Sequence, residues 1–300
     1  GLEFEKNGVI SSRELLNLEE VPEELVVVGG GYIGMEAVTK FCKFGSKVKI
    51  VEAQDRVLVN FDEEVVNHIQ ETSDCYNDEI YTNAKASKIK DGEKPTLVAE
   101  QEGDEIEIEG DQILVAVGRE TRTGLENVEV ENAGLEINEN GFIETDSQMK
   151  AEENIFVVGD ASGQPLLAHK AYIEGKVAGE VASGENVGMD SQFIPKVMYT
   201  DPEVGVVGLT ESEAREQYED VKVGKFSMKH SGRALTTNGG NGFVKVIASK
   251  ENKLLGATFI SERASDMIAE ATLALEMQAY LDDVIGTVHA HPTFPEAFQE

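Results

Sequence analysis

The sequence contains no tryptophan, only two cysteines and few basic residues. Lysine and arginine number 26 against 57 aspartates and glutamates, which gives a formal net charge of −31 at pH 7. A surface this negative repels nucleic-acid phosphates and anionic lipid headgroups, and no basic run forms a compensating patch. We therefore expect no nucleic-acid partner and no membrane association. The charge instead favours solubility in strong salt, as in a halophile's cytoplasm, because salt screens the self-repulsion of the surface.

The two cysteines and the hydropathy of the sequence bear on where in the cell the protein is found. Cys42 and Cys75 lie 33 residues apart, a spacing that matches no metal-binding or redox motif, so a reducing compartment is the simplest interpretation. No apolar run reaches about eighteen residues, and the first six residues contain no basic segment followed by an apolar one. We expect a cytoplasmic protein without a metal site.

Length and hydropathy patterning predict an α/β fold with more than one domain. Three hundred residues, 40% of them hydrophobic, usually divide into two or three cores. Leu25–Val28 is an apolar run typical of a strand buried on both faces, and residues 33–44 keep the spacing of a helix with one apolar face. Strand and helix periods continue to alternate through residues 47–81. Beyond residue 193, strands cluster around two helices, which predicts a separate α+β domain.

An antiparallel insertion is expected within the first domain. Three alternating stretches, 84–90, 96–100 and 105–109, are separated by the turn formers Asp91-Gly92 and Gly103-Asp104. The acids between residues 100 and 109 alternate with isoleucines, which is typical of the solvated face of a strand. We therefore assign no cation site to this acidic stretch.

The sharpest local signal is the G-x-G-x-x-G motif at residues 29–34, between the expected strand and helix. In such a motif Gly29 makes the tight turn, Gly31 lets a pyrophosphate approach the backbone, and Gly34 lets helix and strand pack closely. The helix N-terminus adds N–H groups and the positive end of its dipole. The motif and its surroundings predict a dinucleotide site.

Two glutamates lie near this motif. Glu52 ends the next expected strand, 18 residues after Gly34, where its carboxylate can accept hydrogen bonds from ribose hydroxyls. The same charge repels a 2′-phosphate, which favours NAD over NADP, although Arg56 nearby leaves NADP open. Glu36, inside the first turns of the helix, is by itself best explained as a solvated or capping carboxylate.

Further segments carry a family resemblance. In chain order they are Gly29-Gly-Gly-Tyr-Ile-Gly-Met-Glu36, Val117-Gly-Arg119, Ile155-Phe-Val-Val-Gly-Asp160, Leu167-Ala-His-Lys170, Tyr199-Thr-Asp-Pro-Glu203 and His289-Ala-His-Pro-Thr-Phe-Pro-Glu296. Together they resemble the flavin-dependent pyridine nucleotide-disulfide oxidoreductases, and within them the dihydrolipoamide dehydrogenase branch, from residue 1 to residue 300. The glutathione reductase branch is disfavoured because it has bases where Glu52 stands, and the mercuric reductase branch because its terminal cysteine pair is absent.

The resemblance implies sites for two cofactors, NAD and FAD. It places Glu36 opposite the nicotinamide, in place of the solvated carboxylate, and makes Asp160 the ligand of the FAD ribityl chain. The backbone of residues 167–169 is implied to lie against the pyrimidine edge of the flavin. The implied cofactor-binding residues are Gly29, Gly31, Tyr32, Ile33, Gly34, Glu36, Glu52, Gly118, Asp160, Leu167, Ala168 and His169.

A histidine and a glutamate near the end of the chain form the expected catalytic pair. Glu296 lies five positions after His291, across a turn that contains Pro292, and its carboxylate can hold one ring nitrogen and fix the tautomer. The other nitrogen can then accept a thiol proton near neutral pH. The resemblance makes His291 the base that deprotonates dihydrolipoamide across a dimer interface, with His289 as a structural partner.

Two family features do not occur in these 300 residues. One is an earlier glycine motif for the adenosine half of FAD, and the other is a redox-active cysteine pair separated by four residues. We therefore expect a member that begins about one domain late, and its first residues, Gly1-Leu-Glu-Phe4, resemble the linker before the NAD domain of haloarchaeal members. Its expected parts are an NAD-binding domain at 1–119, the remnant of a FAD domain at 120–190 and an interface domain at 191–300.

Two functions from different classes are carried forward. The first is an oxidoreductase that passes electrons from dihydrolipoamide through a disulfide, absent from these residues, and FAD to NAD, so we expect this chain alone to be inactive. Its implied partners are a second copy of the chain and the dihydrolipoyl domain and acyltransferase of a 2-oxoacid dehydrogenase complex. The second is an NAD-binding and dimerisation module without catalysis.

Overall fold

The computed structural model describes residue 2 and residues 8–76, 79–90, 92–119 and 128–300. The chain divides into two compact units, the first formed by residues 1–118 and 195–300 and the second by residues 119–194. The expected NAD-binding and interface domains therefore share one unit, and the expected FAD remnant forms the other. Among the described residues, no helix combines the length and the apolar character needed to cross a bilayer.

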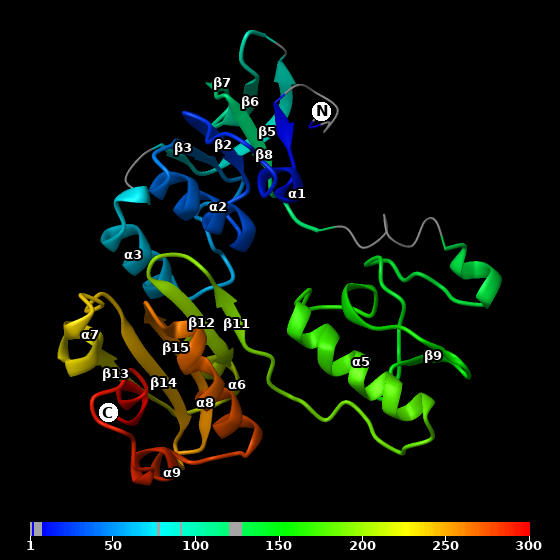
Figure 1. Cartoon of the computed structure of the whole chain (residues 1–300), viewed down its shortest axis with the longest axis vertical. Helices are drawn as coiled ribbons and strands as arrows, with labels where there is room; N and C mark the ends of the chain where they lie inside the picture. Colours follow the sequence, from blue (N-terminus) through cyan, green and yellow to red (C-terminus); the bar gives the residue numbers. More distant parts are fainter. Residues whose placement is uncertain (1, 3–7, 77–78, 91, 120–127) are drawn as a thin grey trace. The chain divides into compact units, whose positions relative to one another are not determined.

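A five-stranded parallel sheet forms the first part of unit 1 (Figure 1). Its strands lie in the order β1 (Val9–Ile10), β8 (Gln112–Val115), β2 (Glu24–Val28), β3 (Lys47–Val51) and β4 (Ile80–Tyr81). The helices between them are α1 (Ser12–Leu15), α2 (Tyr32–Lys43) and α3 (Glu63–Thr72), followed by the 3-10 turn η1 (Asp74–Tyr76). Four of the five residues of β2 are buried, as its apolar run predicts for a central strand.

The antiparallel insertion is confirmed. It consists of β5 (Ala84–Lys90), β6 (Thr96–Gln101) and β7 (Asp104–Glu109), paired in that order. In β7 the acidic side chains are exposed whereas Ile108 is only 4% exposed. The acidic stretch is therefore the solvated face of a strand.

A second five-stranded sheet, wholly antiparallel, completes unit 1. Its order is β11 (Lys196–Met198), β12 (Glu203–Gly208), β15 (Leu254–Ser261), β14 (Phe243–Ser249) and β13 (Val221–Ser227). Helix α8 (Ala264–Glu276) packs against β12 and β15. The shorter elements are α6 (Glu211–Gln217), η4 (Met228–His230), α7 (Gly232–Thr236), α9 (Leu281–Gly286) and α10 (Glu296–Gln299).

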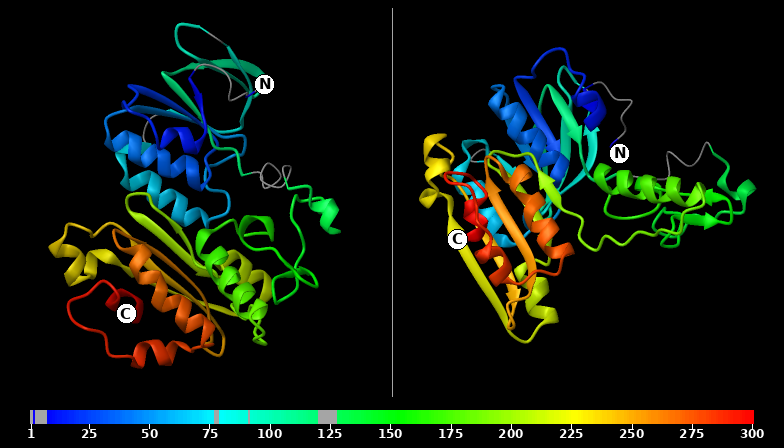
Figure 2. Two further views of the ribbon diagram at one scale, coloured as in Figure 1. Left: turned by 45° about the vertical axis from the view of Figure 1, so that its right-hand side comes forward. Right: turned by 60° about the horizontal axis from the view of Figure 1, so that its bottom comes forward.

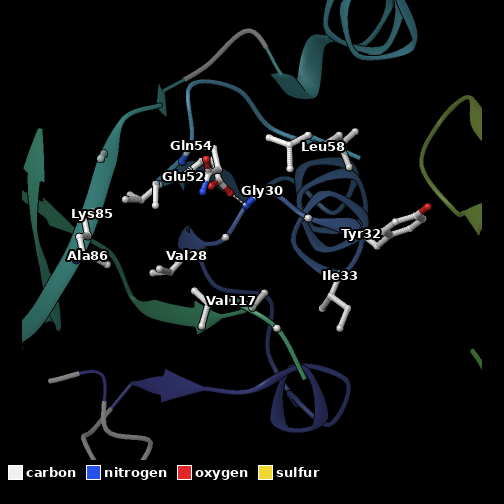
Figure 3. Close-up of a pocket in the computed structure, with 18 of the residues that line it drawn as sticks. Val28, Gly30, Tyr32, Ile33, Glu52, Gln54, Leu58, Lys85, Ala86 and Val117 are labelled. Atoms are coloured by element: carbon white, nitrogen blue, oxygen red, sulfur yellow. Dashed lines mark hydrogen bonds between the residues drawn. The ribbon is translucent and has the colours of Figure 1, made fainter. Parts of the chain in front are cut away.

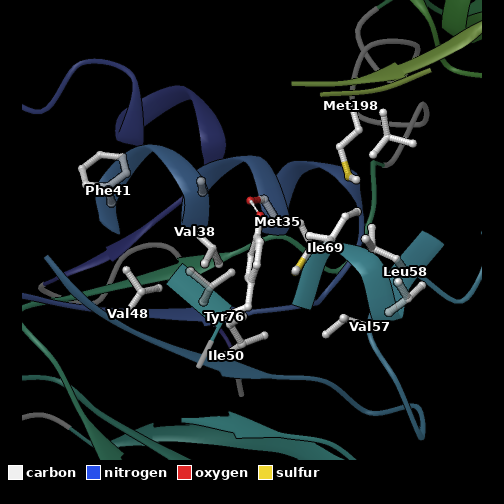
Figure 4. Packing of buried hydrophobic residues seen from close by; sticks show 14 of the residues in the cluster. Met35, Val38, Phe41, Val48, Ile50, Val57, Leu58, Ile69, Tyr76 and Met198 are labelled. Carbon is white, nitrogen blue, oxygen red and sulfur yellow. Dashed lines mark hydrogen bonds between the residues drawn. The ribbon is translucent and has the colours of Figure 1, made fainter. Parts of the chain in front are cut away.

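One hydrophobic cluster joins the two sheets of unit 1. Met35 of α2 and Ile69 of α3 are fully buried, and Met198 and Ile260 of the antiparallel sheet belong to the same cluster (Figure 4). Helices α2 and α3 lie between the two sheets in Figure 1 and in the left view of Figure 2. This shared core explains why two segments separated in sequence behave as one compact unit.

The prediction that Cys42 and Cys75 form no disulfide, made from their spacing, is wrong. Cys42 near the end of α2 and Cys75 in η1 form a disulfide, with their Cα atoms 5.6 Å apart. The physical reason is tertiary: Tyr76, next to Cys75, is buried against α2, where its hydroxyl hydrogen-bonds with that of Thr39 and faces the Met35 carbonyl at 3.4 Å. This packing brings η1 beside α2 and so pairs two cysteines whose spacing matches no motif.

The described part of unit 2 has little regular structure. It contains η2 (Val130–Ala133), a two-stranded sheet of β9 (Lys150–Glu152) and β10 (Ile155–Phe156), η3 (Gly159–Ala161) and helix α5 (Ala168–Ala182). Its buried apolar cluster centres on Val130, Leu135 and Ile143. The buried residues of α5 are Lys170, Glu174 and Val177, so two of the three carry charge.

Candidate functional site

A cavity of about 530 Å³ lies beside the loops that follow β2, β3 and β8 (Figure 3). In a parallel sheet the carboxyl ends of neighbouring strands meet at one edge, which is where such folds bind ligands. Residues that line the cavity include Val28, Gly29, Gly30, Gly31, Tyr32, Ile33, Glu52, Gln54, Leu58, Lys85, Ala86, Val117 and Gly118. Stretches of unit 1 that are far apart in sequence thus build one pocket.

The glycines of the motif differ in what surrounds them. Gly29 has a φ of +103°, and a Cβ there would lie 2.5 Å from the carbonyl oxygen of Ala116. A Cβ on Gly34 would lie 1.9 Å from the carbonyl oxygen of Gly29. At Gly31, by contrast, a Cβ would meet no atom within 4 Å. Gly29 and Gly34 are therefore needed for turn and packing, whereas Gly31 borders open space that a pyrophosphate can enter.

Helix α2 begins at this open space. Gly31 is its N-cap residue and offers no side chain to the first-turn N–H groups. Tyr32 and Ile33 line the cavity, and the Tyr32 ring packs 5.0 Å from that of Phe61, measured between ring centroids. Burial raises the pKa of Tyr32 to about 12, so its phenol stays neutral. The helix end suits an anion, and the tyrosine contributes packing without charge.

Glu52 is held in place by the backbone. Its Oε2 accepts a hydrogen bond from the N–H of Gly30 at 2.6 Å, and its Oε1 accepts one from the N–H of Gln54 at 2.8 Å. Both carboxylate oxygens are thus fixed beside the glycine loop before any ligand arrives (Figure 3). Each oxygen keeps further acceptor capacity, which the hydroxyls of a ribose can use.

The hydrogen bonds of Arg56 do not favour a role in binding phosphate. Its guanidinium donates to the carbonyl oxygens of Val59 at 3.1 Å and Phe61 at 3.0 Å, and to that of Leu58 at 3.5 Å. These bonds tie the guanidinium to the loop that follows β3. The alternative that the sequence left open, a cation for the 2′-phosphate of NADP, is not supported by this arrangement.

Sequence reasoning missed one wall of the cavity. Lys85 and Ala86, on β5 of the antiparallel insertion, also line it (Figure 3). No motif marks these residues, and their alternation is that of any half-exposed strand. Only the folding of the insertion over the end of the parallel sheet brings them to the pocket.

Glu36 has a different environment from the other implied NAD residues. Its Oε1 accepts a hydrogen bond from the backbone N–H of Tyr199 at 2.9 Å, and Lys40 lies 3.6 Å from its other oxygen. It is not among the residues that line the cavity. The carboxylate joins α2 to the segment after β11, and its approach to a nicotinamide stays a prediction.

The implied FAD residues lie in unit 2. Asp160, in η3, forms an ion pair with Arg119, whose Nη2 lies 3.0 Å from its Oδ2. Leu167 is the N-cap of α5, with no side-chain cap, and Ala168 and His169 occupy its first turn. A carboxylate next to an uncapped helix start offers acceptor and donor groups of the kind a ribityl chain and a flavin edge require.

His291 and Glu296 form the expected pair. His291 Nδ1 lies 2.7 Å from Glu296 Oε1, and Glu296 Oε2 accepts the N–H of Thr293 at 2.6 Å. The Thr293 N–H and then the histidine lower the pKa of Glu296. The carboxylate therefore keeps its charge and fixes Nδ1 as the protonated nitrogen, leaving Nε2 as the basic one. The His291 side chain is 80% exposed, so it is open to a substrate or a partner.

A second histidine pair lies two residues away in sequence. His289 Nε2 is 2.7 Å from Glu270 Oε1 of α8, and His289 Nδ1 is 3.0 Å from the Thr287 carbonyl. Burial opposes the charged form, but the bonds to Glu270 and Thr287 outweigh it and raise the pKa of His289. The side chain is only 7% exposed, which fits a structural role.

Comparisons with known proteins identify a family. Residues 2–175 match the family described as pyridine nucleotide-disulphide oxidoreductase, and residues 194–300 match its dimerisation domain. The chain is 41% identical over 304 residues to the dihydrolipoyl dehydrogenase of Halobacterium salinarum and 42% identical over 305 residues to that of Haloferax volcanii. All of this chain is covered in both cases, but only 64% of either relative.

A solved structure shares the fold. The HOCl-induced flavoprotein disulfide reductase RclA from Escherichia coli superimposes with a TM-score of 0.88 at 28% identity, over 96% of this chain and 66% of that one. The same arrangement of elements therefore occurs in a flavoprotein. In length, the present chain spans less than two thirds of these proteins.

Proposed function

The chain belongs to the pyridine nucleotide-disulphide oxidoreductase family, and we propose that it is the NAD-binding and subunit-interface part of a dihydrolipoyl dehydrogenase. The observation that supports this most directly is the cavity of unit 1, where open space at Gly31 faces a carboxylate fixed by the N–H groups of Gly30 and Gln54. A pyrophosphate fits the first feature and a ribose diol the second.

The residues divide into binding and proton-handling groups. Gly29, Gly31 and Gly34 with the start of α2 would hold the pyrophosphate of NAD, and Glu52 its ribose. Asp160 and the backbone of residues 167–169 would hold part of FAD. When bound, these two cofactors would supply the hydride transfer that links oxidation of a dithiol to reduction of the nicotinamide. Lys85 and Arg56 have no role in the proposed hydride transfer.

His291 would handle the thiol proton. Glu296 holds Nδ1–H, so Nε2 is the nitrogen that accepts a proton from dihydrolipoamide, and the imidazolium that forms is stabilised by the adjacent carboxylate. The exposure of His291 suits a base that acts on a group presented by a second subunit, as the dimerisation domain suggests. The proposed partners are a second copy of the chain and a lipoyl-bearing acyltransferase.

The test of the nucleotide site compares NADH with NADPH. Titration followed by nucleotide fluorescence should show tighter binding of NADH, and Glu52→Gln should weaken it on the order of tenfold, since a hydrogen bond to a charged acceptor is lost. Glu105→Gln is the matched control, because Glu105 is an exposed acid on β7 outside the cavity. Equal affinity for both nucleotides, or an unaltered Glu52→Gln variant, would refute the proposed site.

A second function, an NAD-binding and dimerisation module without turnover, is favoured by one observation. The two cysteines of these 300 residues are joined to each other, so this chain supplies no other thiols for a redox centre. Purified chain that binds NADH but neither retains FAD nor oxidises dihydrolipoamide would support the module. Bound flavin with dithiol-dependent NADH formation would support the enzyme, and loss of that formation in His291→Gln would identify the base.

A further inference from the structure

Helix α5 buries charge where a helix normally buries apolar side chains. Lys170 and Glu174 are 6% and 4% exposed, and Val177 is the third buried residue of the helix. Apolar residues elsewhere on the helix are exposed, with Tyr172 at 78% and Ile173 at 43%. An amphipathic helix packs its apolar face inward. The inverted pattern of α5 indicates that the buried pair has a specific task.

The ammonium of Lys170 and both carboxylate oxygens of Glu174 have hydrogen-bond partners. Lys170 Nζ lies 2.8 Å from Glu174 Oε1 and also donates to the carbonyl oxygens of Gly159 at 3.1 Å and Gly163 at 3.0 Å, with Ser162 Oγ at 3.0 Å. Glu174 Oε2 accepts the N–H of Gly159 at 2.7 Å and the hydroxyl of Ser162 at 3.0 Å. Buried charges persist only when they are paired and hydrogen-bonded in this way.

These bonds converge on one short segment, residues 159–163. Both backbone groups of Gly159 are held, its N–H by Glu174 and its carbonyl by Lys170. Gly159 has a φ of +76°, and a Cβ there would lie 3.2 Å from that of Ala171 on α5. The residue that follows this clamped glycine is Asp160, whose own carboxylate pairs with Arg119.

We propose that Lys170 and Glu174 are positioning residues for Asp160. Their buried pair fixes the backbone of residues 159–163 and thereby the direction in which the Asp160 carboxylate meets a ribityl hydroxyl. The inference rests on the proposed FAD role of Asp160. It adds to that role the physical device that holds the carboxylate, in a unit where few apolar contacts are available to do so.

The first test measures amide hydrogen exchange in the chain as it stands. In Glu174→Gln the amides of residues 159–163 should exchange on the order of tenfold faster, because the buried ammonium loses its partner and Gly159 its charged acceptor. The last turns of α5 and all of unit 1 should exchange at the wild-type rate. Glu180→Gln on the same helix is the matched control, because its pair with Lys176 is exposed.

Two further variants separate positioning from folding. Lys170→Met combined with Glu174→Leu removes both charges and leaves an apolar helix face, so unit 2 should stay folded while residues 159–163 lose protection. The single variant Lys170→Arg keeps the charge and should therefore keep part of the wild-type protection of residues 159–163. Uniform acceleration across unit 2, or wild-type protection of residues 159–163 in the double variant, would overturn the proposal.

The second readout is FAD affinity, measured by flavin fluorescence on titration with the chain. The double variant should bind FAD on the order of tenfold more weakly than wild type and resemble Asp160→Asn, in which the exchange of residues 159–163 should stay normal. Unchanged affinity in the double variant would contradict the inference. If the wild-type chain binds no FAD, the FAD part of the proposed function fails, while the exchange data still decide whether the pair fixes the segment.

Discussion

The two units of the molecule each bury a lysine, and they do so in different surroundings. Lys245 of β14 is 2% exposed and lies 2.6 Å from Asp62 Oδ2, with Glu64 and Glu211 at 3.4 and 3.5 Å. Lys170 of unit 2 meets one carboxylate and otherwise backbone and hydroxyl oxygens. Lys245 therefore links side chains from separate elements, whereas Lys170 holds a short backbone segment.

The difference follows from what else each unit has. In unit 1, a large apolar cluster already joins the two sheets, and the Lys245 cluster adds a polar connection between β14, the start of α3 and α6. In unit 2, the apolar cluster is small, and two of the three buried residues of α5 carry charge. In unit 1 the buried ion pairs of Lys245 thus add to an extensive apolar core. In unit 2 the buried Lys170–Glu174 pair helps to hold the fold together where the apolar core is small.

We expect the largest effect on stability from Lys245→Met. Burial alone lowers the pKa of Lys245, but Asp62, Glu64 and Glu211 outweigh it and raise the pKa, so the lysine is charged in the fold. Its removal leaves three carboxylates close together and should cost unit 1 about 3–5 kcal/mol. Lys250→Met, whose pair with Asp220 is exposed, should cost at most about 1 kcal/mol in the same denaturant titration. If both variants lowered the stability equally, the buried ion pairs of Lys245 would contribute no more than an exposed pair.

A pair of truncations tests whether the units unfold separately. Ile50→Ala in unit 1 and Ile143→Ala in unit 2 each remove a side chain that is 2–3% exposed and should cost about 2–5 kcal/mol. Because the chain has no tryptophan, one placed at Tyr218 or at Tyr172 reports on a single unit by fluorescence. Each truncation should shift only the transition of its own unit. A common shift in both signals would show one cooperative core.

Reduction of the Cys42–Cys75 disulfide should act on unit 1 alone. Opening a cross-link over 33 residues restores conformational freedom to the unfolded chain and should lower stability by about 2–4 kcal/mol. The measurement is a denaturant titration with and without dithiothreitol. The double variant Cys42→Ala and Cys75→Ala serves as the control, because its stability should not respond to the reductant. Equal stability of oxidised and reduced wild type would count against the pairing.

The smallest expected effect is a dependence on pH through His289. Its pKa is raised above 6.5 in the fold, so the stability that it contributes is fully present below the unfolded-state pKa and is lost as pH rises through the folded-state pKa. Thermal unfolding of wild type should therefore lose stability over that range relative to His289→Gln. The same slope in both proteins would assign the effect to other groups.

The parallel and antiparallel strands of unit 1 were predictable because their signals are local. An apolar run such as Leu25–Val28, bounded by glycines, indicates a buried strand without knowledge of its neighbours. The positions of Gly29, Gly31, Gly34 and Glu52 are likewise set within one βαβ unit, and the His291–Glu296 pair spans only five residues.

Other features needed contacts between distant segments. The disulfide depends on η1 packing against α2, and Lys85 reaches the cavity because the insertion folds over the end of the parallel sheet. The orientation of Arg56 depends on the carbonyl groups of the loop that it closes. None of these arrangements leaves a periodicity or a motif in the sequence.

Most strands and helices of unit 1, the dinucleotide motif and the histidine–glutamate pair could be predicted from the sequence, because hydropathy period, glycine conformation and short spacings act over a few residues. Only the tertiary structure decided the partners of charged and sulfur-bearing side chains. Lys170 and Glu174, Lys245 and Asp62, and Cys42 and Cys75 are ordinary residues in the sequence. Their roles arise because burial removes water and makes each group depend on whichever partner the fold brings within reach.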